Sequence, residues 1–396
     1  MGESFDTDGV GSADADEAVI AQLASIGQDW DVVMQMLPAN WEAKASELGA
    51  VRRQLRGFAS VGSMLRVLLI HLADGCSLRE TAVRASAGGL STVSDVAVLK
   101  RLRSCGAWFE WMTREMAAGM ALPQAGQAVL ADRRVRLVDG SSVCEPGATG
   151  STWRLHYALN LRTLSCDEVH VTEASVGESL TLFDIREGDV IMADRGFARR
   201  PSLRYVVQRK ADVVLRTSLT NLPLHERGGG GLLPLLALLQ TLAVGQSAGW
   251  AASVHDKHGA IDVRVCAYKK TAAQTLAAQQ AIQQEARKKG RIVRPQTLEA
   301  AGYVIVLTTL MQPSAAAIME FYRRRWQIEL AFKRLKSLLQ LGHLKKVDKG
   351  AARAWLQGKL LVACMIEKLI LTAERFSPWG YVGQDSPPLD AALALA

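Results

Sequence analysis

Five polar residues near the carboxyl end of the chain share a helical spacing. Tyr322, Arg325, Glu329, Lys333 and Lys336 follow one another at intervals of 3, 4, 4 and 3 residues. On a helix of 100° per residue, all five fall within roughly one quadrant. The pattern predicts one long helix over 315–341 whose polar face sets a carboxylate between cations. An adjacent apolar stripe would anchor that helix in a core: Phe321, Ile328, Phe332, Leu335 and Leu339.

Two aspartates follow short apolar runs earlier in the chain. The run 135–138 leads into Asp139-Gly140, and the run 190–193 leads into Asp194-Arg195-Gly196. Either aspartate alone is typical of a turn or a helix cap. Side chains at the carboxyl ends of neighbouring strands converge, however, so the two aspartates with Glu329 predict a cluster of three carboxylates.

Three hard oxygen ligands without Cys or His ligands suit Mg²⁺ or Mn²⁺ rather than Zn²⁺. Two such ions can activate a water or a 3′-hydroxyl and stabilise the leaving oxygen of an in-line phosphoryl transfer. Arg325, Lys333 and Lys336 are then expected to hold phosphates and the negative charge of the transition state. The residues alone therefore predict two-metal phosphoryl transfer on a polyanion.

The same stretches carry a family resemblance. The segment 322-YRRRWQIELAFKRLK-336 fits Y-x2-R-x3-E-x6-K with every spacing intact. Behind it lie 193-ADRGF-197, 138-VDGSS-142 and 145-EPGATGSTWRLHYALNL-161. In these motifs the chain, from about 60 to 375, resembles DDE transposases of the insertion-sequence-four family.

The resemblance implies a function and a site. It implies cut-and-paste transposition by a homodimer in a synaptic complex, which binds double-stranded DNA at terminal inverted repeats, cleaves the ends and joins them to target DNA. Tyr322, Arg325 and Lys336 are implied to contact DNA ends and phosphates. Matched position by position, the motifs imply that Asp139, Asp194 and Glu329 form the catalytic and metal-binding triad. This triad is implied to bind two Mg²⁺ or Mn²⁺ ions.

Two further DNA contacts are expected. Relatives hold a flipped base on an aromatic side chain of the segment inserted between the second aspartate and the glutamate, and Trp250 is the one tryptophan within 218–310. A helix, a glycine turn and a basic helix over 77–105 resemble a helix-turn-helix. We expect DNA contacts from its second helix at Lys100, Arg101 and Arg103.

The pattern along the chain predicts an α/β protein. It has a helical DNA-binding region at 21–122 and a mixed-sheet catalytic core at 123–217 and 311–376. The core's ribonuclease H-like fold and the inserted β-rich domain at 218–310 are implied by the resemblance. Residues 1–20 are expected to form a disordered acidic tail and residues 377–396 an irregular one.

Charge and composition narrow the classes of partner. Residues 1–50 have a formal net charge of −9. Because the whole chain has a net charge of +8, the remaining residues have a net charge of +17. A body this basic favours a polyanion such as nucleic acid. Six scattered cysteines without a Cys-x-x-Cys pair argue against a zinc ribbon and a disulfide framework. With no signal peptide or spanning segment evident, we expect a bacterial cytoplasmic protein that associates with the nucleoid when it acts.

Two alternative functions remain open from the sequence. A metal-dependent DNA nuclease without strand transfer would need the same three carboxylates. A catalytically inactive DNA-binding derivative of a mobile element would keep the basic surface, but it has no chemical reason to keep all three acids. Inverted repeats and a target duplication in the flanking DNA would favour the transposase.

Overall fold

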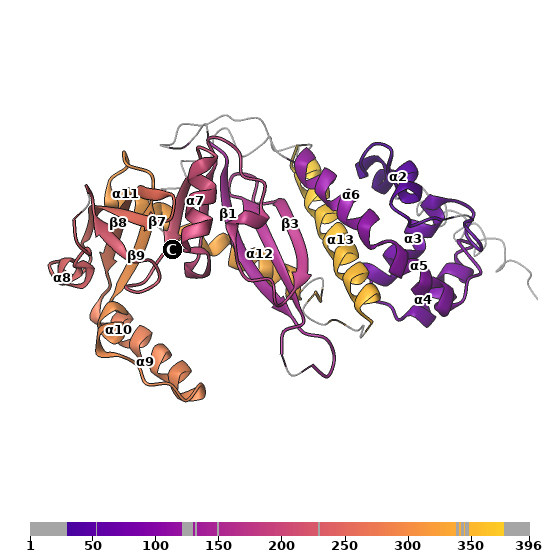
Figure 1. Ribbon diagram of the computed structural model, residues 1–396. Helices are drawn as coiled ribbons and strands as arrows, with labels where there is room; N and C mark the ends of the chain where they lie inside the picture. The colour runs from indigo at the N-terminus through magenta and orange to yellow at the C-terminus, as the bar shows by residue number, and fades with distance from the viewer. Residues whose placement is uncertain are drawn as a thin grey trace, which may run out of the picture.

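The computed structural model describes residues 30–52, 54–120, 130, 133–148, 150–228, 230–337, 340–341, 344 and 348–375. In Figure 1 the N-terminal helices gather at one end of an elongated molecule, and a twisted sheet with helices on both faces forms the rest. The expected acidic tail at 1–20 and the expected irregular tail at 377–396 lie outside the described residues.

The N-terminal helices start where serine side chains can cap them. Ser60, Ser77 and Ser94 each accept a hydrogen bond from a backbone N–H in the first turn. The expected start of a helix at Ser77 is therefore confirmed. The helices are α2 (Trp41–Glu47), α3 (Val61–Leu72), α4 (Leu78–Ala87), α5 (Asp95–Ser104) and α6 (Gly106–Gly119).

The last helix ties this bundle to the sheet. Helix α13 (Lys349–Arg375) runs alongside α6 between the N-terminal helices and the sheet (Figure 1). At Gly358 a Cβ atom would stand 2.5 Å from a methyl carbon of Leu72 on α3. Only glycine allows the two helices to approach this closely.

Nine strands form a single sheet in the order β3-β2-β1-β4-β5-β9-β8-β7-β6. Strands β1, β4 and β5 are parallel to one another, and β2 and β3 continue the sheet antiparallel beyond β1. This half has the strand order of a ribonuclease H-like core, and the expected mixed α/β fold class is confirmed. The strands are β1 (Val135–Val143), β2 (Trp153–Asn160), β3 (Cys166–Glu173), β4 (Val190–Ala193), β5 (Asp212–Arg216), β6 (Leu224–Glu226), β7 (Ser247–Asp256), β8 (Gly259–Lys269) and β9 (Tyr303–Thr308).

The central strands are buried on both faces, which explains their continuous apolar runs. Along β4, Val190 and Met192 belong to one core, and Ile191 and Ala193 belong to the other. The first core lies under α13 and α12 (Trp326–Ser337), and the second lies under α7 (Arg200–Gln208). Side chains with the parity of Met192 therefore face α12.

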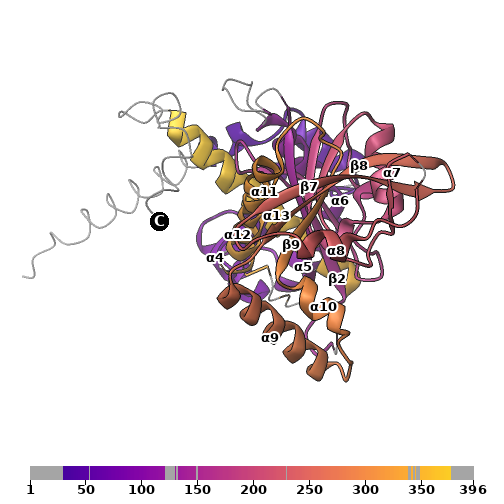
Figure 2. The same ribbon diagram turned by 90° about the vertical axis from the view of Figure 1, so that its left-hand side faces the viewer.

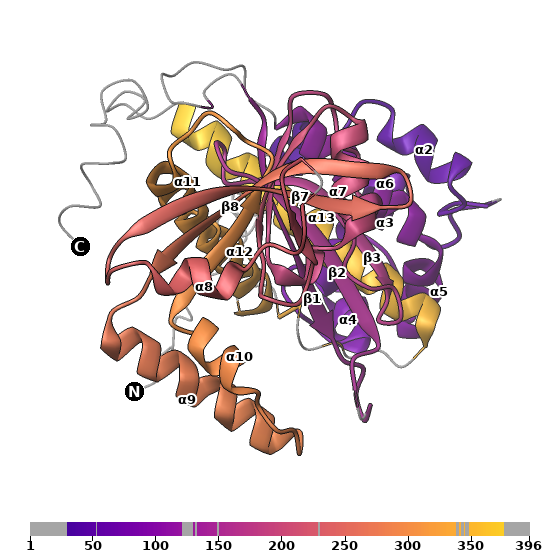
Figure 3. The same ribbon diagram turned by 60° about the vertical axis from the view of Figure 1, so that its left-hand side comes forward.

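The strands of the expected inserted domain do not stand apart from the core. Strand β9 pairs antiparallel with β5 on one side and with β8 on the other, so the sheet runs on without a break. Two helices of this segment, α9 (Ala272–Lys288) and α10 (Pro295–Ala300), project away from the sheet, whereas α8 (Leu235–Gln240) packs against it (Figures 1 and 3).

The expectation of one unbroken helix over 315–341 was wrong. The structure has α11 (Ala315–Arg323) and α12, separated at Arg324 and Arg325. Between them the backbone N–H groups of Arg325, Gln327 and Ile328 bond to carbonyls three residues back rather than four. This tighter turn rotates the chain by more than 100° per residue. Side chains that share one face on a regular helical wheel therefore separate here.

Two other elements differ from expectation. Strand β1 does not end at Asp139 but continues to Val143, because it goes on pairing with β2 after it has left β4. The residue pattern over 178–185 predicts a short helix, but the structure has only a 3₁₀ turn at Leu180–Leu182, where the buried Leu180 joins the second core.

In the part of the chain that the structure describes, no helix combines the length and the apolar character needed to cross a bilayer.

Candidate active site

The two aspartates lie at matching positions of neighbouring parallel strands. Val138 of β1 is in register with Ala193 of β4, and Ala193 is in register with Leu215 of β5. The next residue on each strand is therefore Asp139, Asp194 and Arg216, in a row at the carboxyl edge of the sheet. The expected meeting of the two aspartates at this edge agrees with the register.

This row faces α12. Asp139 is paired across the sheet with Tyr157 of β2, so the two side chains lie on the same face. The Tyr157 ring packs 5.7 Å from the ring of Phe332 on α12. Asp194 has the parity of Met192, which belongs to the same core as Phe332. The helix that carries Glu329 therefore covers the face on which both aspartates stand.

Arg325 connects the two parts of the site. Its Nη1 atom lies 3.6 Å from Oδ2 of Asp139, and its Nη2 atom donates to Oε1 of Glu329. The Arg325 side chain is 13% exposed, whereas that of Glu329 is 57% exposed. The guanidinium is thus held inside the site with one carboxylate at each terminal nitrogen, and Glu329 reaches it from the solvent side.

Burial changes the titration of Asp139. Removal from water raises the pKa of this carboxyl to about 6, although the Gly140 N–H and Arg325 favour the charged form. Asp194 and Glu178 raise the pKa further through like-charge repulsion. Burial is thus the main reason why this carboxyl keeps its proton to a higher pH than an ordinary aspartate.

Tyr322 is not a surface residue. Its ring is 7% exposed, and its hydroxyl oxygen is buried without a hydrogen-bond partner. Burial raises the pKa of this phenol well above its usual value. The Arg325 guanidinium lies 6.0 Å from the centre of the ring. Tyr322 therefore lies beside Arg325 in the interior, where its ring is not accessible to a ligand.

A cationic cavity of about 450 Å³ opens beside Asp194. Arg195, Arg216, Lys270 and Arg294 line it. In the part of the chain that the structure describes, the side chains of the three arginines make no hydrogen bond or ion pair. Lys270 donates to the carbonyl of Ala301, and burial lowers its pKa. The cavity is thus built to receive an anion.

Arg195 and Arg216 were not predicted as site residues, although the sequence carries a signal for them. Arg195 directly follows Asp194, and Arg216 occupies on the third parallel strand the position that the aspartates occupy on the first two. The apolar run 213–215 leads into Arg216 as the runs 135–138 and 190–193 lead into the two aspartates, and this pattern predicts Arg216 at the same edge. Lys270 and Arg294 approach the cavity only through the path of β8, α9 and α10.

Glu178 is a fourth acid at this edge. A Cβ atom on Gly140 would stand 3.0 Å from its Oε1, and one on Gly196 would overlap its Oε2. The two glycines that follow the aspartates therefore leave room for this carboxylate. Among the described residues, Glu178 makes no hydrogen bond or ion pair.

The carboxylates meet part of the requirement of a divalent cation. Asp139 and Asp194 offer hard oxygen donors side by side at the sheet edge. No three His, Cys, Asp or Glu side chains of the described ranges, however, lie close enough together to hold an ion. Glu329 pairs with Arg325 instead. The oxygens of the two aspartates suit a cation, whereas Glu329, the expected third ligand, does not join them in this arrangement.

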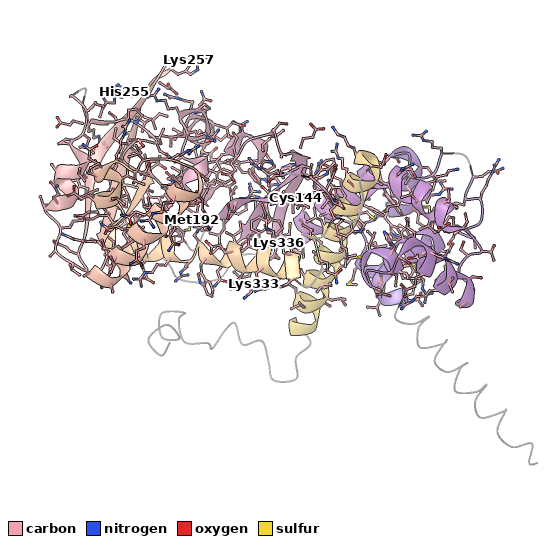
Figure 4. All side chains as sticks on the ribbon, turned by 90° about the horizontal axis from the view of Figure 1, so that it is seen from below. Cys144, Met192, His255, Lys257, Lys333 and Lys336 are labelled. Carbon is pink, nitrogen blue, oxygen red and sulfur yellow. The ribbon has the colours of Figure 1, made fainter. Side chains whose placement is uncertain are left out.

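The other expected DNA contacts are distributed over two regions. Lys333 and Lys336 are exposed on α12, and both are visible on the face of the molecule in Figure 4. Neither ammonium group pairs with an acid in the described part of the chain. On α5, Arg103 lies 3.0 Å from Asp348, and Arg101 donates to the carbonyls of Ala50 and Gln54. Lys100 is exposed beside them.

Trp250, the expected base-holding residue, and Trp326 of the Y-x2-R-x3-E-x6-K segment occupy different surroundings. Trp250 is half-buried on β7, paired with Val265, and packs against the second core. No contact between described residues brings it to the carboxylates. Trp326, which the wheel did not place on the polar face, is 54% exposed at the break between α11 and α12, next to Arg325. The accessible aromatic ring beside the site is that of Trp326.

Comparisons with known proteins agree on one family. The sequence model of the family described as "Transposase DDE domain" matches residues 130–365. The transposase for insertion sequence element IS421 of Escherichia coli is 32% identical over 367 residues, covering 88% of this chain and 96% of that protein. The InsL protein of insertion sequence element IS186A of Escherichia coli (strain K12), a putative transposase by its printed name, is 32% identical over 366 residues with the same coverage.

Among solved structures, the chain is similar to a piggyBac transposase seen by cryo-electron microscopy in a synaptic complex with hairpin DNA. The TM-score is 0.44 at 9% identity, and the match covers 86% of this chain and 72% of that one.

Proposed function

The chain belongs to the DDE transposase family, and from this premise we propose that it cuts the ends of its own insertion sequence and joins them to target DNA. The observation that carries the proposal is the row of Asp139, Asp194 and Arg216 beneath Arg325 and Glu329, beside an unpaired cationic cavity. Carboxylates next to free guanidinium groups suit a reaction in which phosphate charge develops. The Y-x2-R-x3-E-x6-K segment supports assignment to the insertion-sequence-four group.

Asp139, Asp194 and Glu329 would hold the divalent cations, Mg²⁺ or Mn²⁺. Bound there, the ions would activate the attacking oxygen and stabilise the leaving one. Glu329 would complete the set if its carboxylate left Arg325, and the high exposure of its side chain allows that movement. Arg325 is then released from one carboxylate and can hold a phosphate oxygen.

The protein's own cations position the DNA. Arg195 and Arg216 flank Asp194 and can each donate two hydrogen bonds to a phosphate. Lys333 and Lys336 extend the positive surface along α12. Because these groups do not have to leave other partners in the described structure, binding of the backbone costs little reorganisation.

The partners we propose are double-stranded DNA and a second copy of this chain. A linear element has two ends, and one chain presents one set of strand-end carboxylates. Two copies, each acting on one terminal inverted repeat, would process both ends together.

A cleavage assay on linear DNA carrying the candidate ends tests the proposal. Cleavage should require Mg²⁺ and stop in EDTA. Asp139→Asn, Asp194→Asn and Glu329→Gln should each abolish cleavage and leave DNA binding in place. Asp184→Asn, at an exposed acid paired with Arg186 at the surface, is the matched control and should cleave normally.

Full cleavage by any one of the three variants would remove that residue from the site. Cleavage by the unaltered protein without joining to a target plasmid would instead favour a nuclease.

A further inference from the structure

Helices α9 and α10 form an arm that has no core of its own. Neither helix contains a buried residue, and both project away from the sheet (Figures 1, 2 and 3). The arm is nevertheless well defined: Thr271 and Gln274 form a capping box at its start, and Gln279 on α9 donates to the carbonyl of Leu298 on α10. Because neither helix buries a side chain, the packing of this domain does not account for the surface of the arm.

The arm is positively charged where it reaches furthest. Residues 271–302 hold five cations against two acids, Glu285 and Glu299, and all five cations fall within 287–294. The acids are already engaged, by Lys289 at 2.5 Å and by Gln240 at 2.6 Å. Among the described residues, the remaining four cations form no ion pair: Arg287, Lys288, Arg291 and Arg294.

One apolar side chain stands among these cations. Ile292 is 98% exposed, although it lies between Arg291 and Arg294 on the connection from α9 to α10. A fully exposed isoleucine loses its hydrophobic stabilisation in water. Proteins that enter the minor groove of DNA combine arginine or lysine with an apolar side chain of this kind.

The cationic cavity connects the arm to the aspartates. Ala278 and Ile282 of α9 and Arg294 line the same cavity as Asp194 and Arg216. A helix of 17 residues is about 25 Å long, so the tip stands roughly seven base pairs from the base of the arm. DNA lying in the cavity with its cut end at Asp194 would pass along α9 toward the tip.

We propose that the α9–α10 arm is a clamp for duplex DNA, in which Arg287, Lys288, Arg291 and Arg294 contact the phosphate backbone and Ile292 enters the minor groove. This inference rests on the proposed function, which identifies the polyanion as DNA. It adds the surface of the protein that holds the DNA. The occupant is duplex DNA rather than protein because the free charge of the tip is of one sign and complements phosphate.

The salt dependence of binding tests the phosphate contacts. Binding of the full chain to a labelled duplex is measured by fluorescence anisotropy in EDTA over a series of salt concentrations. Each lost phosphate contact should lower the slope of log affinity against log salt by about 1. We expect that change for Arg291→Gln and about twice that change for Arg287→Gln with Arg291→Gln.

The matched control is Lys257→Gln, which also removes one exposed cation, at the turn of the β7–β8 hairpin (Figure 4). It should leave the slope unchanged. Two duplexes distinguish the sources of DNA. If the slope falls only with the duplex that carries the element's end, that end lies in the clamp. If the slope also falls with an unrelated duplex, target DNA lies in the clamp. An unchanged slope with both overturns the proposal.

Ile292 is tested separately. Ile292→Asp should weaken duplex binding at least about tenfold, whereas Ile292→Leu should bind as the unaltered chain does. A minor-groove ligand such as distamycin should compete with the unaltered chain and much less with Ile292→Asp. If Ile292→Asp instead changes the mass found by light scattering and leaves DNA affinity intact, Ile292 contacts a second copy and the minor-groove contact is wrong.

The arm and the catalytic assignment fail in different ways. The binding measurements need neither a metal ion nor cleavage. Intact cleavage by the triad variants, together with a lower slope for the arm variants, would reject the catalytic site and keep the clamp. The converse pair of results would reject the clamp alone.

Discussion

The Nη1 atom of Arg325 lies 3.6 Å from Oδ2 of Asp139, although the two residues come from opposite halves of the chain. The same guanidinium donates to Glu329 through Nη2. A single cation therefore sits between two carboxylates that would otherwise repel each other at the sheet edge. In the absence of an ion, this arginine provides the positive charge that the site requires.

Arg325→Gln should destabilise the ion-free protein, because it leaves a mostly buried aspartate without a counter-charge. We expect a loss of about 2 kcal/mol in the free energy of unfolding, from urea unfolding in EDTA. Arg325→Lys should recover only part of this loss, since an ammonium group cannot span two carboxylates. The control is Arg323→Gln, whose exposed pair with Glu320 should be worth under about 0.5 kcal/mol. Equal losses for Arg323 and Arg325 would mean that the pairing inside the site is not special.

Asp139→Asn should stabilise the protein at neutral pH and not at acidic pH. The pKa of Asp139 is about 6 in the folded chain, against 3.8 for an ordinary aspartate. For an acid whose pKa is raised by folding, the stabilisation is complete below the unfolded pKa and is lost as pH rises through the folded one. The unaltered protein therefore carries an unfavourable charge near pH 8 that the variant lacks, while the amide oxygen of the introduced side chain can still accept from the Gly140 N–H.

The measurement is urea unfolding in EDTA at about pH 4 and about pH 8. The stability of Asp139→Asn relative to the unaltered chain should rise between these pH values by up to about 3 kcal/mol, from a shift of about two units at 1.36 kcal/mol each. A difference that is independent of pH would show that burial does not control this carboxyl.

The sequence was sufficient for the strands and the two aspartates, because short runs buried on both faces have a strong and local pattern. The register of β1, β4 and β5 then follows from the parallel arrangement, and it places Asp139 beside Asp194. What the sequence could not give is the path of segments whose position depends on distant partners. Lys270 and Arg294 reach the cavity only because β9 pairs with both β5 and β8.

The helical wheel failed for a related reason. It assumes a constant rotation per residue, and the three-residue hydrogen bonds near Arg325 break that regularity. Tyr322 was expected on an exposed polar face but is buried, whereas Trp326, which the wheel leaves off that face, is exposed. Pairing between Arg325 and the carboxylates stabilises a local geometry that no periodicity in the sequence encodes.

Trp326 and Trp250 should respond oppositely to truncation. Trp326→Ala removes an exposed ring, so its free energy of unfolding should change by less than about 0.5 kcal/mol. If the ring stacks on a DNA base beside the site, end binding should weaken by about 1–3 kcal/mol, and Trp326→Phe should retain most of the affinity. Trp250→Ala should instead lower stability by about 1 kcal/mol or more, because the ring packs on the second core.

Thermal unfolding and anisotropy with end DNA, run on both variants, check this pair of predictions. If Trp250→Ala keeps its stability but binds the end DNA more weakly, Trp250 holds the base instead of Trp326.

The exposed lysines of α12 should contribute to DNA binding more than the paired arginine of α5. Lys333 and Lys336 have no acidic partner among the described residues, so a phosphate can bind them without displacing one. Arg103 must first leave Asp348, 3.0 Å away, which offsets part of the gain. Lys333→Gln with Lys336→Gln should therefore lower the slope of log affinity against log salt by about 2, and Arg103→Gln by less than about 1.

Anisotropy titrations over a salt series measure both slopes on the same end duplex. A larger change for Arg103 than for the two lysines would move the main DNA surface from α12 to the N-terminal helices, and Lys100→Gln would then be the next variant to measure.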